Sequence, residues 1–264
     1  MSFDPFAEFR MDGHNVIITG GAQNIGAGIA RTLSAAGAKV MIADLNGEMA
    51  ADTAAGIARE TGGDCRGMAC NVTRQEDIDA VVTATANAFG GISTLVNNVG
   101  WGGRQPDPAA IPEEEFVASY QLNTISAYRM SMACVPYLEK AENGSITNSG
   151  SFSSAVPAYD ILPYATAKAA LNQMMVSLAH MLNKKVRVNS ILIGTVITEG
   201  YASAGITPEM QERMMHPDNL IGHPGRPQDI ANAMLWLCSP AAQWVSGQTI
   251  NVHGGGNVVR LFGK

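Results

Sequence analysis

The sequence predicts a single α/β domain built on a doubly wound parallel sheet of about seven strands, with helices on both faces. Short apolar runs rich in β-branched residues alternate with helical patterns of 12 residues or more along the whole chain. These runs contain few polar residues, which is typical of parallel strands buried on both faces. The composition shows no break or linker, so one domain over residues 1–264, with an N-terminal arm at 1–12, is the simplest division.

The first half of the chain consists of short strands that each lead into a helix. The first strand is Asn15–Thr19, whose apolar β-branched residues end at a glycine pair. A helical pattern over 25–36 follows and stops at Gly37. Next come a strand at 39–43, a helix at 47–60, a strand at 65–69, a helix at 75–89 and a strand at 93–96.

The second half continues the alternation with longer helices. One long helix is expected from 112 to about 139, and another at 163–182 has Pro163 in its first turn, where proline is tolerated. The remaining elements are a strand at 145–148, a strand at 186–192, a helix at 227–238 and a last strand at 248–252.

The composition narrows the possible partners. Hydrophobic residues make up 46% and charged residues 15%, which suits a packed globular domain. The net charge is −6 and no basic block is longer than Lys184-Lys185, so nucleic acid and anionic membrane surfaces are poor partners. No apolar run reaches the ~18 residues that span a bilayer, and the start of the chain lacks the pattern of a signal peptide. We therefore expect a cytoplasmic protein.

The cysteines and histidines form no metal motif. Cys65, Cys70, Cys134 and Cys238 make no C-x-x-C pair, and none has a histidine at metal-ligand spacing. The five histidines are scattered along the chain. We expect reduced structural thiols and no metal site, in agreement with a cytoplasmic location.

The turn after the first strand suits a dinucleotide. It reads Thr19-Gly20-Gly21-Ala22-Gln23-Asn24-Ile25-Gly26, at the edge where a Rossmann-like sheet holds a pyrophosphate against the next helix. Glycine permits the tight turn and a close backbone approach. Asp44 ends the second strand, where a carboxylate can accept hydrogen bonds from the adenosine ribose and repels a 2′-phosphate. Because no basic residue stands at 21–24 or at Leu45, we expect NAD(H) rather than NADP(H).

Two residues on the expected helix at 163–182 suit proton transfer. Tyr164 and Lys168 are four residues apart, hence one above the other on a helix face. An ammonium near a phenol favours the phenolate and pulls the tyrosine pKa down from about 10. Such a tyrosine can exchange a proton with an alcohol or a ketone. The spacing alone is common on exposed helices, so this interpretation depends on the rest of the chain.

The order of several motifs resembles the short-chain dehydrogenase/reductase family. The motifs are TGGAQNIG, LVNNVG, Asn123, Ser151, the Tyr164-x-x-x-Lys168 pair and RVNSILIGTVIT, and the resemblance covers residues 12 to 256. The segments ITPEMQERMMH and GRPQDIANAMLWLC look very like the C-terminal third of bacterial 7α-hydroxysteroid dehydrogenases. The resemblance implies an NAD-dependent oxidoreductase that interconverts a secondary alcohol and a ketone.

The resemblance also implies roles for individual residues. The catalytic set is Asn123, Ser151, Tyr164 and Lys168. The residues at cofactor-binding positions are Gly20, Gln23, Asn24, Ile25, Gly26, Asp44, Leu45, Asn71, Val72, Asn98, Gly100, Gly194, Val196 and Thr198, together with Tyr164 and Lys168. The departures from the family pattern are Asn24 for a glycine, Asn71 for an aspartate, Val99 for an alanine and Ile193 for a proline. Asparagine tolerates a positive φ better than most residues, so Asn24 can still form the turn.

The implied chemistry divides the hydride and the proton between cofactor and protein. In the reducing direction the nicotinamide gives a hydride to the carbonyl carbon, Ser151 hydrogen-bonds the oxygen, and Tyr164 delivers the proton. Lys168 lowers the tyrosine pKa and bonds the nicotinamide ribose, while Asn123 holds a water that links Lys168 to solvent. Ser149 is the nearest competitor of Ser151, and the spacing of thirteen residues to Tyr164 favours Ser151.

The residues that face the substrate carry a weaker signal. Residues 199–220 match the position of the family's substrate lid, and their methionines serve either to contact an apolar ligand or to seat a small helix. We expect an apolar pocket for a bulky small molecule, with a hydroxysteroid as one candidate. Trp101 suits a pocket wall or a subunit contact, and the family resemblance implies a homotetramer formed through the long helices and the C-terminal strand. The expected pocket residues are Trp101, Val156, Tyr201 and Met214.

Two other functions stay open at this stage. A 3-oxoacyl-carrier-protein reductase would share the motifs, but an acidic carrier needs a basic docking patch, of which the sequence shows little. A non-catalytic dinucleotide-binding module or redox sensor would have lost the catalytic set, which is complete in this sequence.

Overall fold

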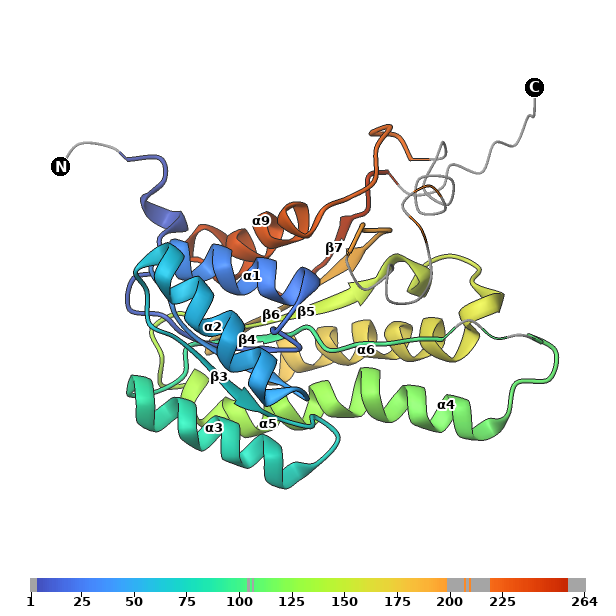
Figure 1. Cartoon of the computed structure of the whole chain (residues 1–264), viewed down its shortest axis with the longest axis horizontal. Helices are drawn as coiled ribbons and strands as arrows, with labels where there is room; N and C mark the ends of the chain where they lie inside the picture. The colour runs from blue at the N-terminus through green and yellow to red at the C-terminus, as the bar shows by residue number, and fades with distance from the viewer. Residues whose placement is uncertain are drawn as a thin grey trace.

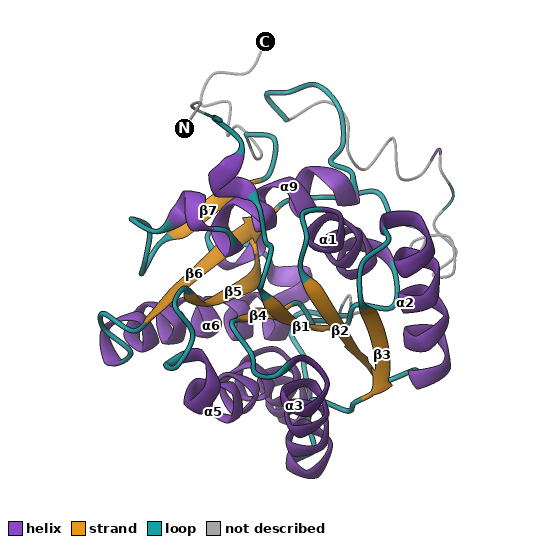
Figure 2. Ribbon diagram, turned by 90° about the vertical axis from the view of Figure 1, so that its left-hand side faces the viewer, coloured by secondary structure: helices purple, strands orange, loops and turns teal. Residues whose placement is uncertain are grey.

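Seven parallel strands form one sheet. They are β1 (Asn15–Thr19), β2 (Lys39–Asp44), β3 (Cys65–Ala69), β4 (Thr94–Asn97), β5 (Gly144–Ser151), β6 (Val186–Ile193) and β7 (Thr249–Val252). The computed structural model describes residues 4–103, 105, 107–198, 207, 209 and 219–255. The strand order is β3-β2-β1-β4-β5-β6-β7, which Figure 2 shows from one side. The order reverses between β1 and β4, the position at which doubly wound sheets bind their ligands.

Helices cover both faces of the sheet, as Figure 1 shows. One face carries α1 (Asn24–Ala35), α2 (Gly47–Thr61) and α9 (Pro227–Cys238). The other carries α3 (Gln75–Phe89), α4 (Glu113–Tyr120), α5 (Ser126–Leu138) and α6 (Leu162–Met181). Short 3₁₀ turns lie at η1 (Ala7–Phe9), η3 (Phe152–Ser154), η4 (Tyr159–Ile161) and η5 (Pro240–Ala242). The predicted doubly wound α/β class is therefore confirmed.

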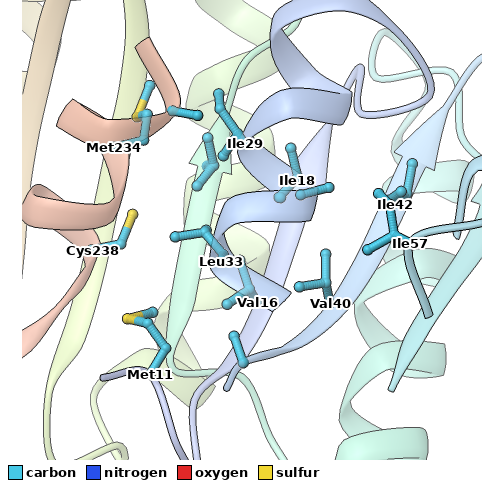
Figure 3. Packing of buried hydrophobic residues seen from close by; sticks show 14 of the residues in the cluster. Met11, Val16, Ile18, Ile29, Leu33, Val40, Ile42, Ile57, Met234 and Cys238 are labelled. Carbon is cyan, nitrogen blue, oxygen red and sulfur yellow. The ribbon is translucent and has the colours of Figure 1, made fainter. Parts of the chain in front are cut away.

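The hydrophobic core has two layers because successive residues of a strand point to opposite faces of the sheet. Val16 and Ile18 of β1 pack in the layer that contains Ile29 and Leu33 of α1 (Figure 3). Ile17 points the other way, into the layer beneath α3, α5 and α6. Each large aliphatic side chain that is fully buried stabilises the fold by roughly 1.5–3 kcal/mol.

The strand that carries Ser151 is longer than the sequence predicts. The expected strand at 145–148 extends to Ser151, and β6 extends to Ile193, with Ser151 and Ile193 in register across the pair. The prediction stopped early because Ser149-Gly150-Ser151 has no strand-like composition. Ile193, which stands where the family has a proline, continues the sheet and pairs with Val252 of β7.

The long helix expected at 112–139 was predicted correctly in extent but not in its regularity. A π-helical turn, η2 (Gln121–Ile125), separates α4 from α5 and has Asn123 at its centre. Such turns insert one residue into an α-helix and occur frequently at functional sites. The hydrophobic pattern of the sequence does not indicate the turn.

Candidate active site

The turn between β1 and α1 depends on residues that accept unusual backbone geometry. Gly20 and Asn24 have φ angles of +63° and +54°, in the left-handed region. A Cβ on Gly26 would overlap the carbonyl oxygen of Gly20, so only glycine lets the first turn of α1 approach the end of β1. Asn24 thus takes the left-handed conformation, which asparagine tolerates better than most residues, in the place of the family's glycine.

Asn98, just beyond β4, connects this turn to β5. Its Nδ2 donates to the carbonyl oxygen of Gly20 at 3.0 Å, and its Oδ1 accepts from the Ser149 hydroxyl at 2.9 Å. Thr19 Oγ1 accepts from the backbone nitrogens of Asn98 and Val99 at 3.0 and 3.2 Å. Because the Ser149 hydroxyl is bonded to Asn98, this arrangement supports Ser151 as the serine that meets a substrate.

Asp44, at the end of β2, lies beside the same turn. Its Oδ2 accepts from the backbone nitrogen of Ala22, and its Oδ1 accepts from that of Asn46, both at 3.1 Å. Leu45 follows and is 75% exposed. A carboxylate oxygen has two lone pairs, so both oxygens of Asp44 can accept a further hydrogen bond from a ligand hydroxyl.

The loop after β3 brings Asn71 and Val72 to the same edge of the sheet. Asn71 Oδ1 accepts from the backbone nitrogen and the hydroxyl of Thr73, at 3.0 and 2.7 Å. The backbone nitrogen of Asn71 donates to Asp77 at 3.0 Å, and Val72 is buried. The amide oxygen of Asn71 thus shapes the loop.

Lys168 lies almost entirely inside the protein. It is 2% exposed, and its Nζ donates to the carbonyl oxygen of Ser149 at 2.9 Å. The same nitrogen lies 5.8 Å from the centre of the Tyr164 ring. Burial lowers the pKa of Lys168 to about 8, which leaves the side chain mostly charged at neutral pH. The α6 helix therefore presents an ammonium next to the phenol.

Two glycines after β4 let the backbone approach these side chains. A Cβ on Gly100 would collide with Nζ of Lys168 and would lie 2.9 Å from Oδ1 of Asn123. A Cβ on Gly102 would collide with the Tyr164 side chain. Sequence reasoning included Gly100 and missed Gly102, although the Gly102-Gly103 pair after Trp101 was an available signal.

Asn123 fixes this loop from the π-helical turn. Its Nδ2 donates to the carbonyl oxygens of Trp101 and Ser119 at 3.0 and 2.9 Å, and its Oδ1 accepts from the backbone nitrogen of Trp101 at 3.1 Å. The side chain is 1% exposed. Because both ends of the amide are bonded, Asn123 holds the backbone of Trp101, although Trp101 as a whole remains 68% exposed.

Ser151 ends β5 next to a second serine. Its Oγ lies 2.8 Å from the hydroxyl of Ser153 and accepts from the backbone nitrogen of Ser153 at 3.3 Å. Exposed apolar side chains follow in the same loop, with Val156 at 38% and Tyr159 at 73%. The backbone nitrogen of Gln105 donates to the carbonyl oxygen of Asp160 at 2.7 Å, which ties this loop to the segment that carries Trp101.

The segment after β6 is anchored on two sides. The backbone nitrogen of Gly194 donates to the carbonyl oxygen of Val252 at 3.1 Å, and Val196 forms a bridge with Gly225. A Cβ on Gly194 would lie 2.6 Å from Cβ of His253, so the residue that follows β7 packs closely against this segment. Thr198 is half-buried and is the last described residue before 207.

Tyr201 and Met214, with Met210, Met215 and most of the expected lid at 199–220, lie outside the described residues. Within the described ranges, no group of three or more His, Cys, Asp or Glu side chains could hold a metal ion. In that same part of the chain, no helix has the length and hydropathy required to cross a membrane.

The chain is similar to known proteins over nearly its whole length. Residues 20–257 match the family model described as enoyl-(acyl carrier protein) reductase. The chain is 38% identical to the 7α-hydroxysteroid dehydrogenase of Escherichia coli (strain K12), over 94% of this chain and 95% of that protein. It is 35% identical to the 4-formylbenzenesulfonate dehydrogenase of Comamonas testosteroni, over 92% of this chain and 97% of that protein. A solved structure of a 7α-hydroxysteroid dehydrogenase complexed with NADH and 7-oxo-glycochenodeoxycholic acid matches it with a TM-score of 0.87 and 36% identity, covering 99% of this chain and 100% of that one.

Proposed function

Since this chain belongs to the short-chain dehydrogenase/reductase family, we propose that it is an NAD(H)-dependent oxidoreductase that interconverts a secondary alcohol and a ketone on a bulky apolar substrate. One observation carries the proposal. The buried Lys168 ammonium lies against the Tyr164 ring at the carboxyl edge of the sheet, where β5 also ends at Ser151. A phenol, an ammonium and a hydroxyl at one edge are the groups that proton transfer to a carbonyl oxygen requires.

The turn between β1 and α1 fits a dinucleotide. Gly20 and Gly26 place no side chain over the turn, and α1 begins beside it, so the N-terminal end of a helix faces the position of a pyrophosphate. Asp44 would hold the adenosine ribose, and the segment from Gly194 to Thr198 would hold the nicotinamide amide. When bound, NAD(H) supplies or accepts the hydride at the substrate carbon.

The protein's own residues manage the substrate oxygen. In the reducing direction, the Ser151 hydroxyl donates a hydrogen bond to the oxygen, where negative charge develops. Tyr164 gives its proton to that oxygen, and the Lys168 ammonium stabilises the phenolate that remains. In the oxidising direction the phenolate takes the proton from the alcohol. Asn123 orients the loop that carries Gly100 against Lys168.

The substrate class follows from the relatives and from the exposed side chains near the site. The relative from Escherichia coli and the protein in the matching solved structure are both described as 7α-hydroxysteroid dehydrogenase. In this chain Trp101, Val156 and Tyr159 are exposed apolar side chains on the segments joined by the bond from Gln105 to Asp160. These features support a hydroxysteroid or a similarly bulky secondary alcohol as the substrate.

The test is a substrate panel read as NADH formation at alkaline pH. It contains hydroxysteroids, cyclic alcohols and aryl alcohols, and NADH consumption with a 3-oxoacyl thioester is measured in parallel. We expect turnover of at least one bulky alcohol and little of the thioester. Turnover of the thioester alone would favour the acyl-carrier alternative, to which the matching family model gives some support.

We further propose that the enzyme is a homotetramer in the cytoplasm. Val117, Tyr120 and Tyr128 are large side chains on α4 and α5 that are more than two-fifths exposed in the single chain, which supports a subunit contact there. All four cysteines are buried as free thiols, which agrees with a reducing compartment. Sedimentation that shows a monomer at micromolar concentration would contradict the assembly.

A further inference from the structure

The hydroxyl of Ser151 has two neighbours that can fill its acceptor sites. A serine oxygen has two lone pairs and a single proton. The backbone nitrogen of Ser153 donates to Ser151 Oγ at 3.3 Å, and the Ser153 hydroxyl lies 2.8 Å from the same atom. If the Ser153 hydroxyl donates, both lone pairs are occupied and the proton of Ser151 is left for another acceptor. In the reaction proposed above, that acceptor is the substrate oxygen.

Two further side chains hold the backbone of Ser151, namely Ser154 in η3 and Asn172 on α6. Ser154 Oγ donates to the carbonyl oxygen of Ser151 at 2.6 Å. Asn172 Nδ2 donates to Ser154 Oγ at 2.8 Å. Asn172 follows Tyr164 and Lys168 at the same four-residue interval, so the three side chains share one face of α6. One helix thus carries the acid/base pair and also holds the strand end that carries Ser151.

The direction of this chain of hydrogen bonds is set by its first donor. Because the Asn172 amide donates to Ser154, the only proton of Ser154 is free for the Ser151 carbonyl. An acceptor at position 172 would take that proton, and the bond to Ser151 would be lost. Whether the group at position 172 donates or accepts a hydrogen bond therefore matters as well as its presence.

Stability alone does not explain why an asparagine stands at position 172. Its Oδ1 is buried and has no hydrogen-bond partner among the described residues, and a Cβ on Gly150 would lie 2.9 Å from it. An unsatisfied buried oxygen destabilises the folded state. An apolar side chain of the same size would avoid that cost, so the benefit of asparagine lies in the hydrogen bond that it donates.

We propose that Asn172, Ser154 and Ser153 are positioning residues that fix the Ser151 hydroxyl as a hydrogen-bond donor to the substrate oxygen. The proposal rests on the oxidoreductase function proposed above and adds to it a residue set that acts only through Ser151. Ser153 and Ser154 are hydrogen-bonded to Ser151, and Asn172 is hydrogen-bonded to Ser154. Their effect is expected on the chemical step and not on cofactor binding.

The test compares variants of the full-length enzyme with the panel alcohol that the wild type turns over fastest. The isosteric Asn172→Asp replaces the donor at position 172 by an acceptor and so reverses the hydrogen bond to Ser154. We expect kcat to fall about tenfold or more, because the Ser151 hydroxyl would be displaced from the developing oxyanion. Asn172→Leu and Ser154→Ala each remove one bond, and we expect kcat to fall several-fold. Ser154→Thr, which keeps the hydroxyl, should restore most of the activity lost in Ser154→Ala.

Two measurements separate positioning from a general structural effect. The Kd of NADH should stay within about twofold of wild type, and the thermal midpoint of Asn172→Leu should be equal or higher, because the buried oxygen is gone. The double variant Asn172→Leu/Ser154→Ala should lose no more activity than the more affected single variant, since both act through one chain of bonds. Asn87→Leu, on the exposed face of α3, is the matched control and should behave as wild type.

The outcomes distinguish this inference from the proposed function. An active wild type with an unchanged kcat in Asn172→Asp and Ser154→Ala would overturn the positioning role. So would a loss of kcat matched by equal losses of NADH affinity and thermal stability. A wild type without turnover of any panel alcohol would refute the function, and crystal structures would then decide the inference, which requires Ser151 Oγ to be displaced in Asn172→Asp.

Discussion

The two halves of the sheet bury different kinds of side chain. On the β1 and β2 side the buried strand residues are mainly apolar, as in Val16-Ile17-Ile18 and Val40-Met41-Ile42-Ala43. On the β4, β5 and β6 side (Figure 2) the sheet also buries amides and hydroxyls, among them Asn97, Asn148 and Asn189. Asn97 donates to Asn148 at 2.9 Å, and Asn148 donates to the carbonyl oxygen of Asn189 at 3.1 Å.

The difference teaches how each half does its work. The β1 half offers a ligand its backbone, which requires glycine and a rigid apolar support. The β5 half offers side chains, whose positions must be set to a fraction of an ångström, and satisfied buried hydrogen bonds provide that precision. A substitution in one half should therefore impair the function of that half and leave the other half working.

Replacing Tyr164 by Phe should remove catalysis and leave the nucleotide half intact. The variant loses the proton donor, so kcat should fall by at least about 10³-fold. The Kd of NADH, measured by fluorescence titration, should change little because β1 and α1 are untouched. Retained turnover in this variant would refute Tyr164 as the acid/base.

Replacing Gly26 by Ala should weaken cofactor binding and leave the catalytic side chains in place. The new Cβ would overlap the Gly20 carbonyl oxygen, so the turn must move by about an ångström. We expect NADH affinity to fall on the order of 100-fold, the scale of such a displacement. Crystal structures should show Ser151, Tyr164 and Lys168 unmoved. Undiminished affinity would mean that the turn does not hold the pyrophosphate.

Replacing Lys168 by Met should abolish turnover but stabilise the protein at neutral pH. Burial lowers the pKa of Lys168 from 10.5 to about 8, so the folded state holds the charged form at a cost. Allowing for the lost bond to the Ser149 carbonyl, the gain in unfolding free energy should be about 2 kcal/mol.

The pH dependence of that gain has a definite sign. The cost of the buried ammonium is complete below pH 8 and disappears as the pH rises toward 10.5, where the unfolded chain also loses the proton. The stability difference between Lys168→Met and wild type, from denaturant titrations, should therefore shrink over this window. A variant less stable than wild type at pH 7 would contradict the prediction.

Replacing Asp44 by Ala is expected to give the smallest effect of the four. The variant loses the carboxylate that we propose holds the ribose, together with the bonds from Ala22 and Asn46. We expect about a tenfold loss of NAD preference over NADP, the value of one charge-assisted hydrogen bond. The ratio of kcat/KM for the two cofactors measures it, with Glu48→Ala on the exposed part of α2 as a control. A wild type that prefers NADPH would overturn the interpretation of Asp44.

The sequence predicts the apolar half of the fold better than the polar half. The bounds of β1, β3, α3 and α9 agree with the predictions because hydrophobic periodicity and caps define them. The end of β5 was missed since Ser149, Gly150 and Ser151 do not look like a strand, and they join the sheet through pairing with β6.

The candidate site shows the same division. Local motifs predicted Tyr164, Lys168 and the glycine turn as site residues, because the residues of each motif are close in sequence and their chemistry is specific. Ser153, Ser154 and Asn172 were missed, since the bond from Asn172 to Ser154 joins residues 18 positions apart and exists only once α6 packs on β5. The four-residue interval from Lys168 to Asn172 was the one local signal.

The π-helical turn η2 rotates the side chains of α5 about the helix axis relative to those of α4. Each residue of an α-helix turns the chain by about 100°, so one inserted residue rotates everything downstream by that angle. Deleting one residue within Gln121–Ile125 would turn this region into a regular α-helix and would rotate Asn123 away from Trp101. A single-codon deletion on this helix would thus release the loop that carries Trp101 while Asn123, Ser151, Tyr164 and Lys168 all stay in the sequence. Conversely, the insertion of one residue into a regular helix can create a contact like that between Asn123 and Trp101.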